Sequence, residues 1–241
     1  MAGLTSLPGP GPDPVEDPGP TTLRLRELLR RDDHAARSTL FLRLLYSPAA
    51  AATAFALAAT DDALPRATLA LLRDLDPRLL GLEQRARRRQ LRWHLARELP
   101  LLPRLVPDAE IDAALASFLD APAFWEGAGR TIGESFCLHL VSRPTLSEPT
   151  RLLVRLAAVL SALANRPTLP SPWPARGPAL ALPEARATET LLSGWRLVEA
   201  WRRVERGGFE PGSPVGEGTS LTVATVDGDG VVRVAALEVG A

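Results

Sequence analysis

Apolar side chains recur every three or four residues through most of the chain, which places them on one face of an α-helix. Ser47-Pro48 and Asp76-Pro77 are typical helix starts, because a capping side chain precedes a proline in the first turn. Ser147-Glu148-Pro149 has the same form before a long apolar stripe. Helices are therefore predicted at about 23–31, 39–46, from 48, from 64, 76–98, from 108, 131–141 and from 147.

The pattern changes near the C-terminus. Thr188 to Val204 keeps helical spacing, but apolar and polar positions alternate from Leu221 to Val226 and again from Val231 to Leu237. Asp227 to Gly230 between them has the residues of a tight turn, so these segments predict a β-hairpin. The predicted fold is mainly α: a helical domain at 22–166, followed by a small C-terminal α/β module with a β-hairpin at 184–241.

Two proline-rich segments flank the predicted helical domain. Residues 1–21 contain prolines and glycines and no basic residue, so a disordered tail is expected rather than a secretion signal. Residues 167–183 contain six prolines and are expected to form a semi-rigid linker. The most apolar stretch, Ala49 to Ala59, is too short to cross a bilayer. A cytoplasmic protein is predicted.

The charge is balanced, since 28 arginines and no lysines meet 28 acidic residues. A net charge of zero gives no overall attraction to nucleic acid or to anionic membranes. The densest basic run contains Arg85, Arg88, Arg89 and Arg92, which form the polar face of a predicted helix. Three interpretations of this run remain open. It forms a solvated helix face, a patch for a partner protein or acidic peptide, or the DNA-binding helix of a regulatory protein at Arg85–Arg92.

Candidate catalytic groups are few, because the chain has one cysteine and three histidines. Gly133 to Cys137 follows the G-x-S-x-G nucleophile pattern only in part, since Cys137 replaces the last glycine. Glu134, Cys137 and His139 lie close in sequence, but the two-residue offset turns His139 away from Cys137 on a helix. An enzyme centred on Ser135, Cys137 and His139 is the least favoured reading, and neither a metal site nor a cofactor is predicted.

Several segments, taken in order, resemble a known family. They are "LRLLYSPAAAATAFA", "LLRDLDPRLLGLEQRARRRQL", "ASFLDAPAFWEGAGRTIGESFCLHLVSR", "PTRLLVRLAAVLSAL", "TETLLSGWRLVEAWRRV" and "LTVATVDGDGVVRVAAL". Over roughly residues 38–241 the chain resembles actinobacterial partner proteins of multinuclear non-haem iron-dependent oxidative enzymes. The resemblance implies a non-catalytic subunit that binds the leader of a ribosomally made precursor peptide and presents the peptide to the iron enzyme. The iron is then expected in the partner enzyme.

The predicted hairpin offers a place for such a peptide, since a sheet edge can accept an extended chain through main-chain hydrogen bonds. Either Leu221–Val226 or Val231–Leu237 is expected to provide the edge, above an apolar floor from the helix predicted at Thr188–Val204. The alternative is that the hairpin merely completes the fold. The predicted peptide-binding residues are Leu221, Val223, Thr225, Val232, Val234, Leu191, Trp195 and Val198. The predicted partner-binding residues are Arg85, Arg88, Arg89 and Arg92.

Overall fold

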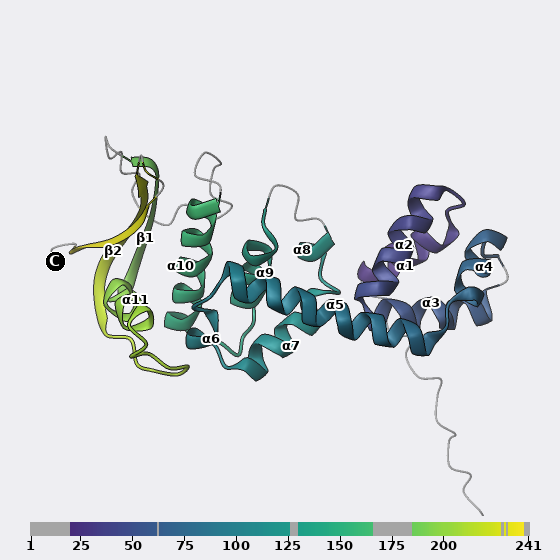
Figure 1. The fold of residues 1–241 in the computed structure, drawn as a ribbon, viewed down its shortest axis with the longest axis horizontal. Coiled ribbons are helices and arrows are strands. Elements are labelled where there is room, and N and C mark those ends of the chain that lie inside the picture. The colour runs from purple at the N-terminus through teal and green to yellow at the C-terminus, as the bar shows by residue number, and fades with distance from the viewer. Residues whose placement is uncertain are drawn as a thin grey trace, which may run out of the picture.

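The protein is an elongated array of helices that ends in a small antiparallel sheet (Figure 1). The computed structural model describes residues 20–61, 63–125, 130–165, 185–227, 229 and 231–238. The first part comprises α1 (Pro20–Arg30), α2 (His34–Tyr46), α3 (Pro48–Thr60) and α4 (Arg66–Asp74). The middle part comprises α5 (Pro77–Glu98), α6 (Leu102–Leu105), α7 (Asp108–Phe118), α8 (Pro122–Trp125), α9 (Ile132–Val141) and α10 (Glu148–Asn165). The last part comprises β1 (Ala185–Trp195), α11 (Leu197–Glu205), β2 (Glu217–Asp227) and β3 (Val232–Glu238). The mainly α fold with a C-terminal α/β module is thus confirmed.

Side-chain caps explain where several helices begin. Ser47 accepts a hydrogen bond from the Ala50 amide at 2.9 Å, and Pro48 occupies the first turn of α3. Asp76 caps α5 in the same way, through the Arg78 amide at 2.7 Å. These bonds satisfy amides that the helix itself leaves without acceptors. The two starts predicted from sequence are therefore confirmed.

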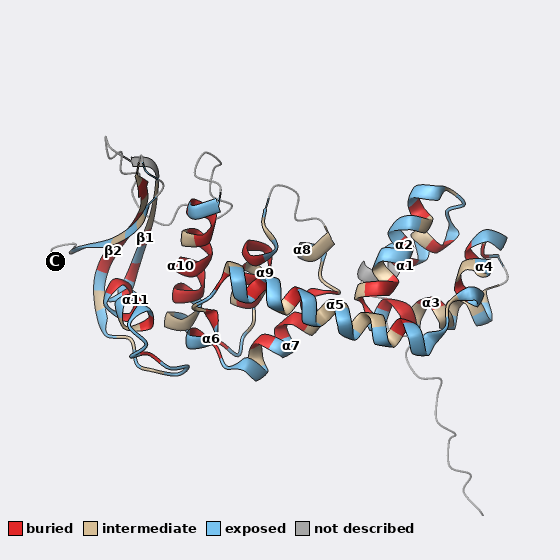
Figure 2. Ribbon diagram, in the orientation of Figure 1, coloured by how far each residue is buried: buried red, intermediate tan, exposed pale blue. Residues whose placement is uncertain are grey.

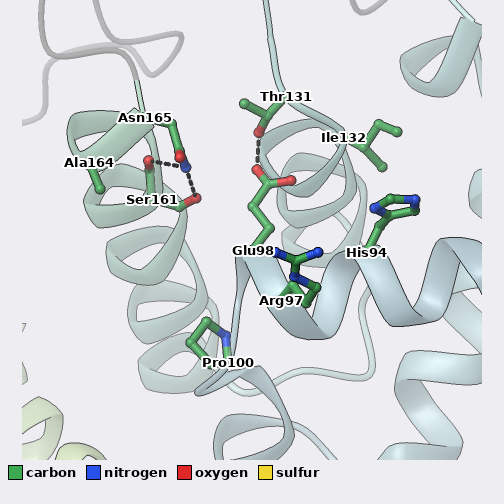
Figure 3. A pocket seen from close by; sticks show the side chains of 9 residues that line it. All are labelled: His94, Arg97, Glu98, Pro100, Thr131, Ile132, Ser161, Ala164 and Asn165. Carbon is green, nitrogen blue, oxygen red and sulfur yellow. Dashed lines mark hydrogen bonds between the residues drawn. The ribbon is translucent and has the colours of Figure 1, made fainter.

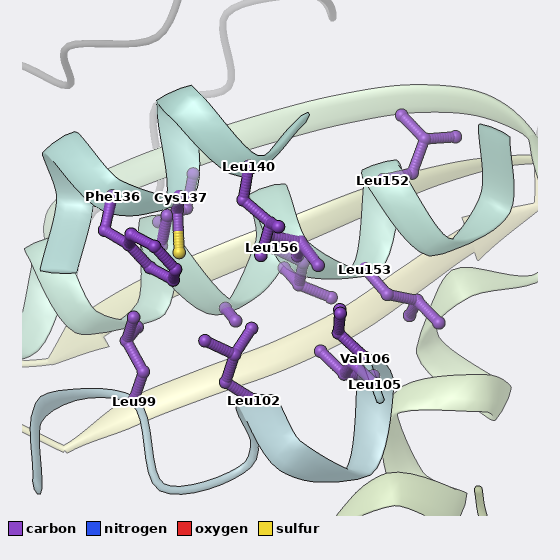
Figure 4. Close-up of a cluster of buried hydrophobic side chains, with 14 of the residues drawn as sticks. Leu99, Leu102, Leu105, Val106, Phe136, Cys137, Leu140, Leu152, Leu153 and Leu156 are labelled. Carbon is purple, nitrogen blue, oxygen red and sulfur yellow. The ribbon is translucent and has the colours of Figure 1, made fainter. Parts of the chain in front are cut away.

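The buried side chains form two clusters that meet along α5 (Figure 2). The first cluster lies among α1 to α4 and takes Leu80 from α5. The second takes Leu91 and Leu95 from the same helix and continues through α10 into the sheet (Figure 4). One face of this 22-residue helix therefore anchors both halves of the molecule.

Aromatic rings join the two halves beside α5. Phe118 is fully buried on α7, and its ring centroid lies 5.4 Å from Phe136 and 5.3 Å from Phe124. Phe124 in turn lies 5.4 Å from Tyr46 at the end of α2. Tilted and edge-on pairs at these distances add attraction beyond the apolar area that they bury. Phe118 is consequently the centre of a chain of contacts from α9 to α2.

The sheet has the order β1-β2-β3, and both pairings are antiparallel. Ala224 pairs with Val234 and Val226 with Val232, so these side chains point to the same face. That face packs on α10 and α11, and the four side chains belong to the second cluster or pack against it. The predicted hairpin is confirmed, with β2 beginning at Glu217 rather than Leu221.

The helix predicted over Thr188–Val204 is wrong in its first half. Ala185–Trp195 is strand β1, which pairs with β2 from Ala185↔Asp227 to Trp195↔Glu217, and only Leu197–Glu205 is helical. A register shift between Ser193 and Trp195 marks the end of the regular pairing, around Gly194. The apolar spacing of Ala185–Trp195 is compatible with a helix or with a strand. Pairing with β2, which lies about thirty residues further along the sequence, makes it a strand. The sheet therefore has a third strand, β1, which precedes α11 in the sequence. Phe209 lies in the segment that connects α11 to β2, and its side chain is buried in the core.

The predicted proline-rich linker at 167–183 lies outside the described residues. So does the predicted tail, apart from its last two positions, where α1 begins at Pro20. In the part of the chain that the structure describes, no helix has the length and apolar character needed to cross a bilayer.

Candidate functional site

The edge of the sheet at β3 is the first candidate site. β2 is the central strand and is hydrogen-bonded on both sides, so the expectation that Leu221–Val226 could be an edge is wrong. Within the described residues, β3 pairs with β2 alone. Of the two expected edges, Val231–Leu237 is therefore the one that lies at the side of the sheet, and β1 forms the opposite side.

The direction of the backbone groups along β3 follows from the turn. The Asp227 amide donates to the Val231 carbonyl at 3.1 Å, so the pair 227–231 is a hydrogen-bonded one. Such pairs alternate with non-bonded pairs in an antiparallel ladder. Arg233, Ala235 and Leu237 therefore bond to β2, whereas the amides and carbonyls of Val232, Val234 and Ala236 point to the open edge.

A cavity of about 280 Å³ lies beneath this edge, between the sheet and the two helices that cover it. Val232 and Val234 of β3 form one wall, and Leu160 of α10 forms another. Val198, Trp201, Arg202 and Glu205 of α11 complete the lining. The Trp201 indole donates to the Glu205 carboxylate at 2.9 Å, which fixes the ring against the apolar wall. The site therefore combines main-chain donors and acceptors at its rim with an apolar floor.

The structure brings together only part of the predicted peptide-binding set. Val198, Val232 and Val234 line the cavity. Leu191 lies on the same face of the sheet but is buried in β1, and Trp195 is half-buried at the end of β1. Side chains alternate between the two faces along β2, and Ala224 and Val226 point to the cavity side. The predicted residues between and beside them therefore point to the opposite face: Leu221, Val223 and Thr225. Sequence reasoning missed Leu160 and Trp201, because only the packing of α10 and α11 on the sheet brings these two residues beside β3.

The predicted partner-binding arginines form the second candidate site. Arg85, Arg88, Arg89 and Arg92 all line one cavity of about 550 Å³ between α5 and α7. Their helical spacing predicts that they share one face of α5, and all four side chains do line this one cavity. The neighbouring α7 contributes Asp112 and Leu115, which the sequence did not connect with them.

A third cavity, of about 760 Å³, lies where α5 ends, α9 begins and α10 ends (Figure 3). Its central carboxylate, Glu98, accepts hydrogen bonds from the Thr131 hydroxyl and, at 3.0 Å, from the Gly133 amide. A Cβ at Gly133 would lie 2.5 Å from that carboxylate, so glycine permits the close approach. Asn165 donates to the Ser161 carbonyl at 2.9 Å. Glu98 and Asn165 thus serve to hold helix ends.

Thr131→Ala is expected to lower the free energy of unfolding by about 1–2 kcal/mol. The Thr131 hydroxyl oxygen accepts from the Glu134 amide at 3.1 Å and also donates to Glu98, so alanine removes the cap and one partner of a carboxylate. Urea unfolding followed by circular dichroism measures the change. Thr131→Ser keeps the hydroxyl and is the matched control, and equal losses in both variants would contradict the capping role.

The three residues of the least favoured hypothesis, an enzyme, all lie on α9, where Ser135 and Cys137 are buried. Cys137 is fully buried, and burial, with smaller effects from Glu98 and Glu134, raises the pKa of its thiol far above the usual range. The His139 imidazole hydrogen-bonds to the Ser117 hydroxyl at 2.8 Å and lies against the Phe118 ring. Burial and the nearby Arg143 lower the pKa of His139. Within the described residues, no three Cys, His, Asp or Glu side chains gather in a way that could hold a metal ion.

Native Cys137 is expected to resist a thiol-disulfide reagent such as DTNB at pH 8. Its raised pKa keeps the thiol protonated at that pH, and only the thiolate reacts. Denaturation in guanidinium chloride exposes the side chain, restores an ordinary pKa and should give one thiol per chain. Fast labelling of the native protein would show that the site opens readily.

No protein-family model matches this chain, and no curated protein or solved structure matches it either.

Proposed function

We propose that the protein is a non-catalytic partner subunit that binds a ribosomally made precursor peptide along β3 and presents it to an iron-dependent oxidative enzyme. The observation that carries the proposal is the open edge of β3 above the cavity lined by Val198, Val232 and Val234. The family resemblance of the sequence supplies the kind of peptide and the kind of enzyme.

The peptide binds in this proposal as a fourth strand of the sheet. Its main chain pairs with the outward amides and carbonyls of Val232, Val234 and Ala236, which supply affinity for any extended chain. Alternate side chains of an added strand point to the same face. Those on the α11 side enter the cavity, where Trp201 and Leu160 favour an apolar side chain. Arg202 and Glu205 at the cavity add polar selection.

The chemistry is assigned to the partner enzyme because the reactive side chains of this chain have structural roles. Cys137 is a buried thiol, and His139 is held by Ser117. The iron and the oxidation therefore belong to the enzyme that receives the peptide, and this chain contributes binding and orientation.

The genomic neighbourhood gives the first test. A gene for a short peptide and a gene for an iron oxidative enzyme are expected beside the gene of this protein. The purified protein should then retain both products, separately or together, in size-exclusion chromatography. An absence of any complex among the three proteins would overturn the proposal.

A further inference from the structure

The cavity between α5 and α7, here called the arginine groove, carries an unusual charge arrangement. It is lined by Leu82, Arg85, Arg88, Arg89, Arg92, Asp112 and Leu115. Only one of these seven residues is acidic, and four are arginines. Because the whole chain has no net charge, this local excess of positive charge is a property of the groove and not of the protein.

One of the four arginines is already neutralised. Arg92 forms ion pairs with Asp108, at 2.8 Å, and with Asp112, both on α7. These contacts hold α5 against α7 and account for the acidic residue of the groove. Arg92 therefore has a structural role.

The other three arginines have no acidic partner in the described part of the chain. No ion pair joins Arg85, Arg88 or Arg89 to a carboxylate there. Arg85 and Arg89 are exposed, and Arg88 is half-buried. The groove therefore presents guanidinium groups with which the carboxylates of a ligand could pair.

Apolar side chains determine which kind of anion fits. Leu82 is 55% exposed at one side of the groove, and the buried Leu115 forms its floor. The sugar-phosphate backbone of nucleic acid has no apolar side chain to pack against these two leucines. A peptide with both acidic and apolar side chains matches the arginines and the leucines together.

We propose that the arginine groove binds an acidic, amphipathic segment of a partner protein. Its carboxylates pair with Arg85, Arg88 and Arg89, with the planar two-point geometry that guanidinium favours. An apolar side chain of the same segment packs between Leu82 and Leu115. The groove lies between α5 and α7. These helices lie apart from the sheet (Figure 1), so this inference does not depend on peptide binding at β3.

A fluorescein-labelled model peptide of glutamate and leucine in a helical pattern tests the proposal by fluorescence anisotropy. The full-length protein should bind it at low salt, with an affinity that falls as salt rises. Arg85→Glu/Arg89→Glu, at two exposed positions, should weaken binding about tenfold or more, since it reverses two charges. Arg88→Ala should also weaken binding of the peptide. The control Arg66→Glu/Arg151→Glu makes the same charge change on α4 and α10 and should bind like the unchanged protein.

Three results would overturn the proposal. Equal weakening in the control variant would show that only overall charge matters. Tighter binding of duplex DNA than of the peptide, lost in Arg85→Glu/Arg89→Glu, would assign the groove to nucleic acid. The third result concerns residues 1–19, which carry three acidic and no basic residues. Much tighter peptide binding by the full-length variant Asp13→Asn/Glu16→Gln/Asp17→Asn would assign the groove to this chain's own N-terminal segment.

Discussion

Val234→Pro is expected to weaken precursor-peptide binding about tenfold or more while the sheet stays folded. The Val234 amide points to the open edge of β3, so proline removes a donor that β2 does not use. The proline ring also occupies the space that the main chain of an added strand needs. Anisotropy of the labelled precursor peptide measures the affinity, and circular dichroism with thermal unfolding checks the fold.

Two controls separate binding from folding. Val234→Thr keeps the amide and nearly the same shape, so its affinity should stay close to that of the unchanged protein. Ala235→Pro lies one residue along, where the amide donates to β2, and should lower the melting temperature. Full binding by a folded Val234→Pro variant would refute docking at this edge and favour a hairpin that only completes the fold.

Phe118→Ala is expected to lower the free energy of unfolding by about 3–5 kcal/mol. Phe118 is fully buried and contacts Phe124, Phe136 and His139, so alanine leaves a cavity that these rings cannot close. Small domains are often stable by only about 5–15 kcal/mol, so this loss is a large share of the total. Urea denaturation of the two proteins, monitored by tryptophan fluorescence, measures it.

The matched control for this substitution is Phe41→Ala on α2. Phe41 is 37% exposed, so the same truncation removes less buried area there and should cost about 1 kcal/mol or less. Similar losses for both variants would contradict the central position of Phe118. A loss of cooperativity in Phe118→Ala alone would indicate that the two halves of the molecule unfold separately, because the chain of rings from α9 to α2 is broken.

Local signals were sufficient for most of the helices. The caps at Ser47 and Asp76 and the apolar spacing of α10 act within a few residues, so sequence alone located them. The grouping of Arg85, Arg88, Arg89 and Arg92 also followed from helical spacing. The groove that they line did not, because α7 supplies its other wall through the ion pairs of Arg92.

Sequence by itself determined that this protein is mainly helical, that its C-terminal strands form a hairpin and that four of its arginines share one face of α5. Only the tertiary structure decided that Ala185–Trp195 is a strand, that β2 is central and that β3 keeps an open edge above Trp201. Helix caps and periodicity are local, whereas strand pairing is a contact between distant segments. The candidate site depends on which segments pair, and a one-residue shift in register would turn Val232 and Val234 away from the cavity.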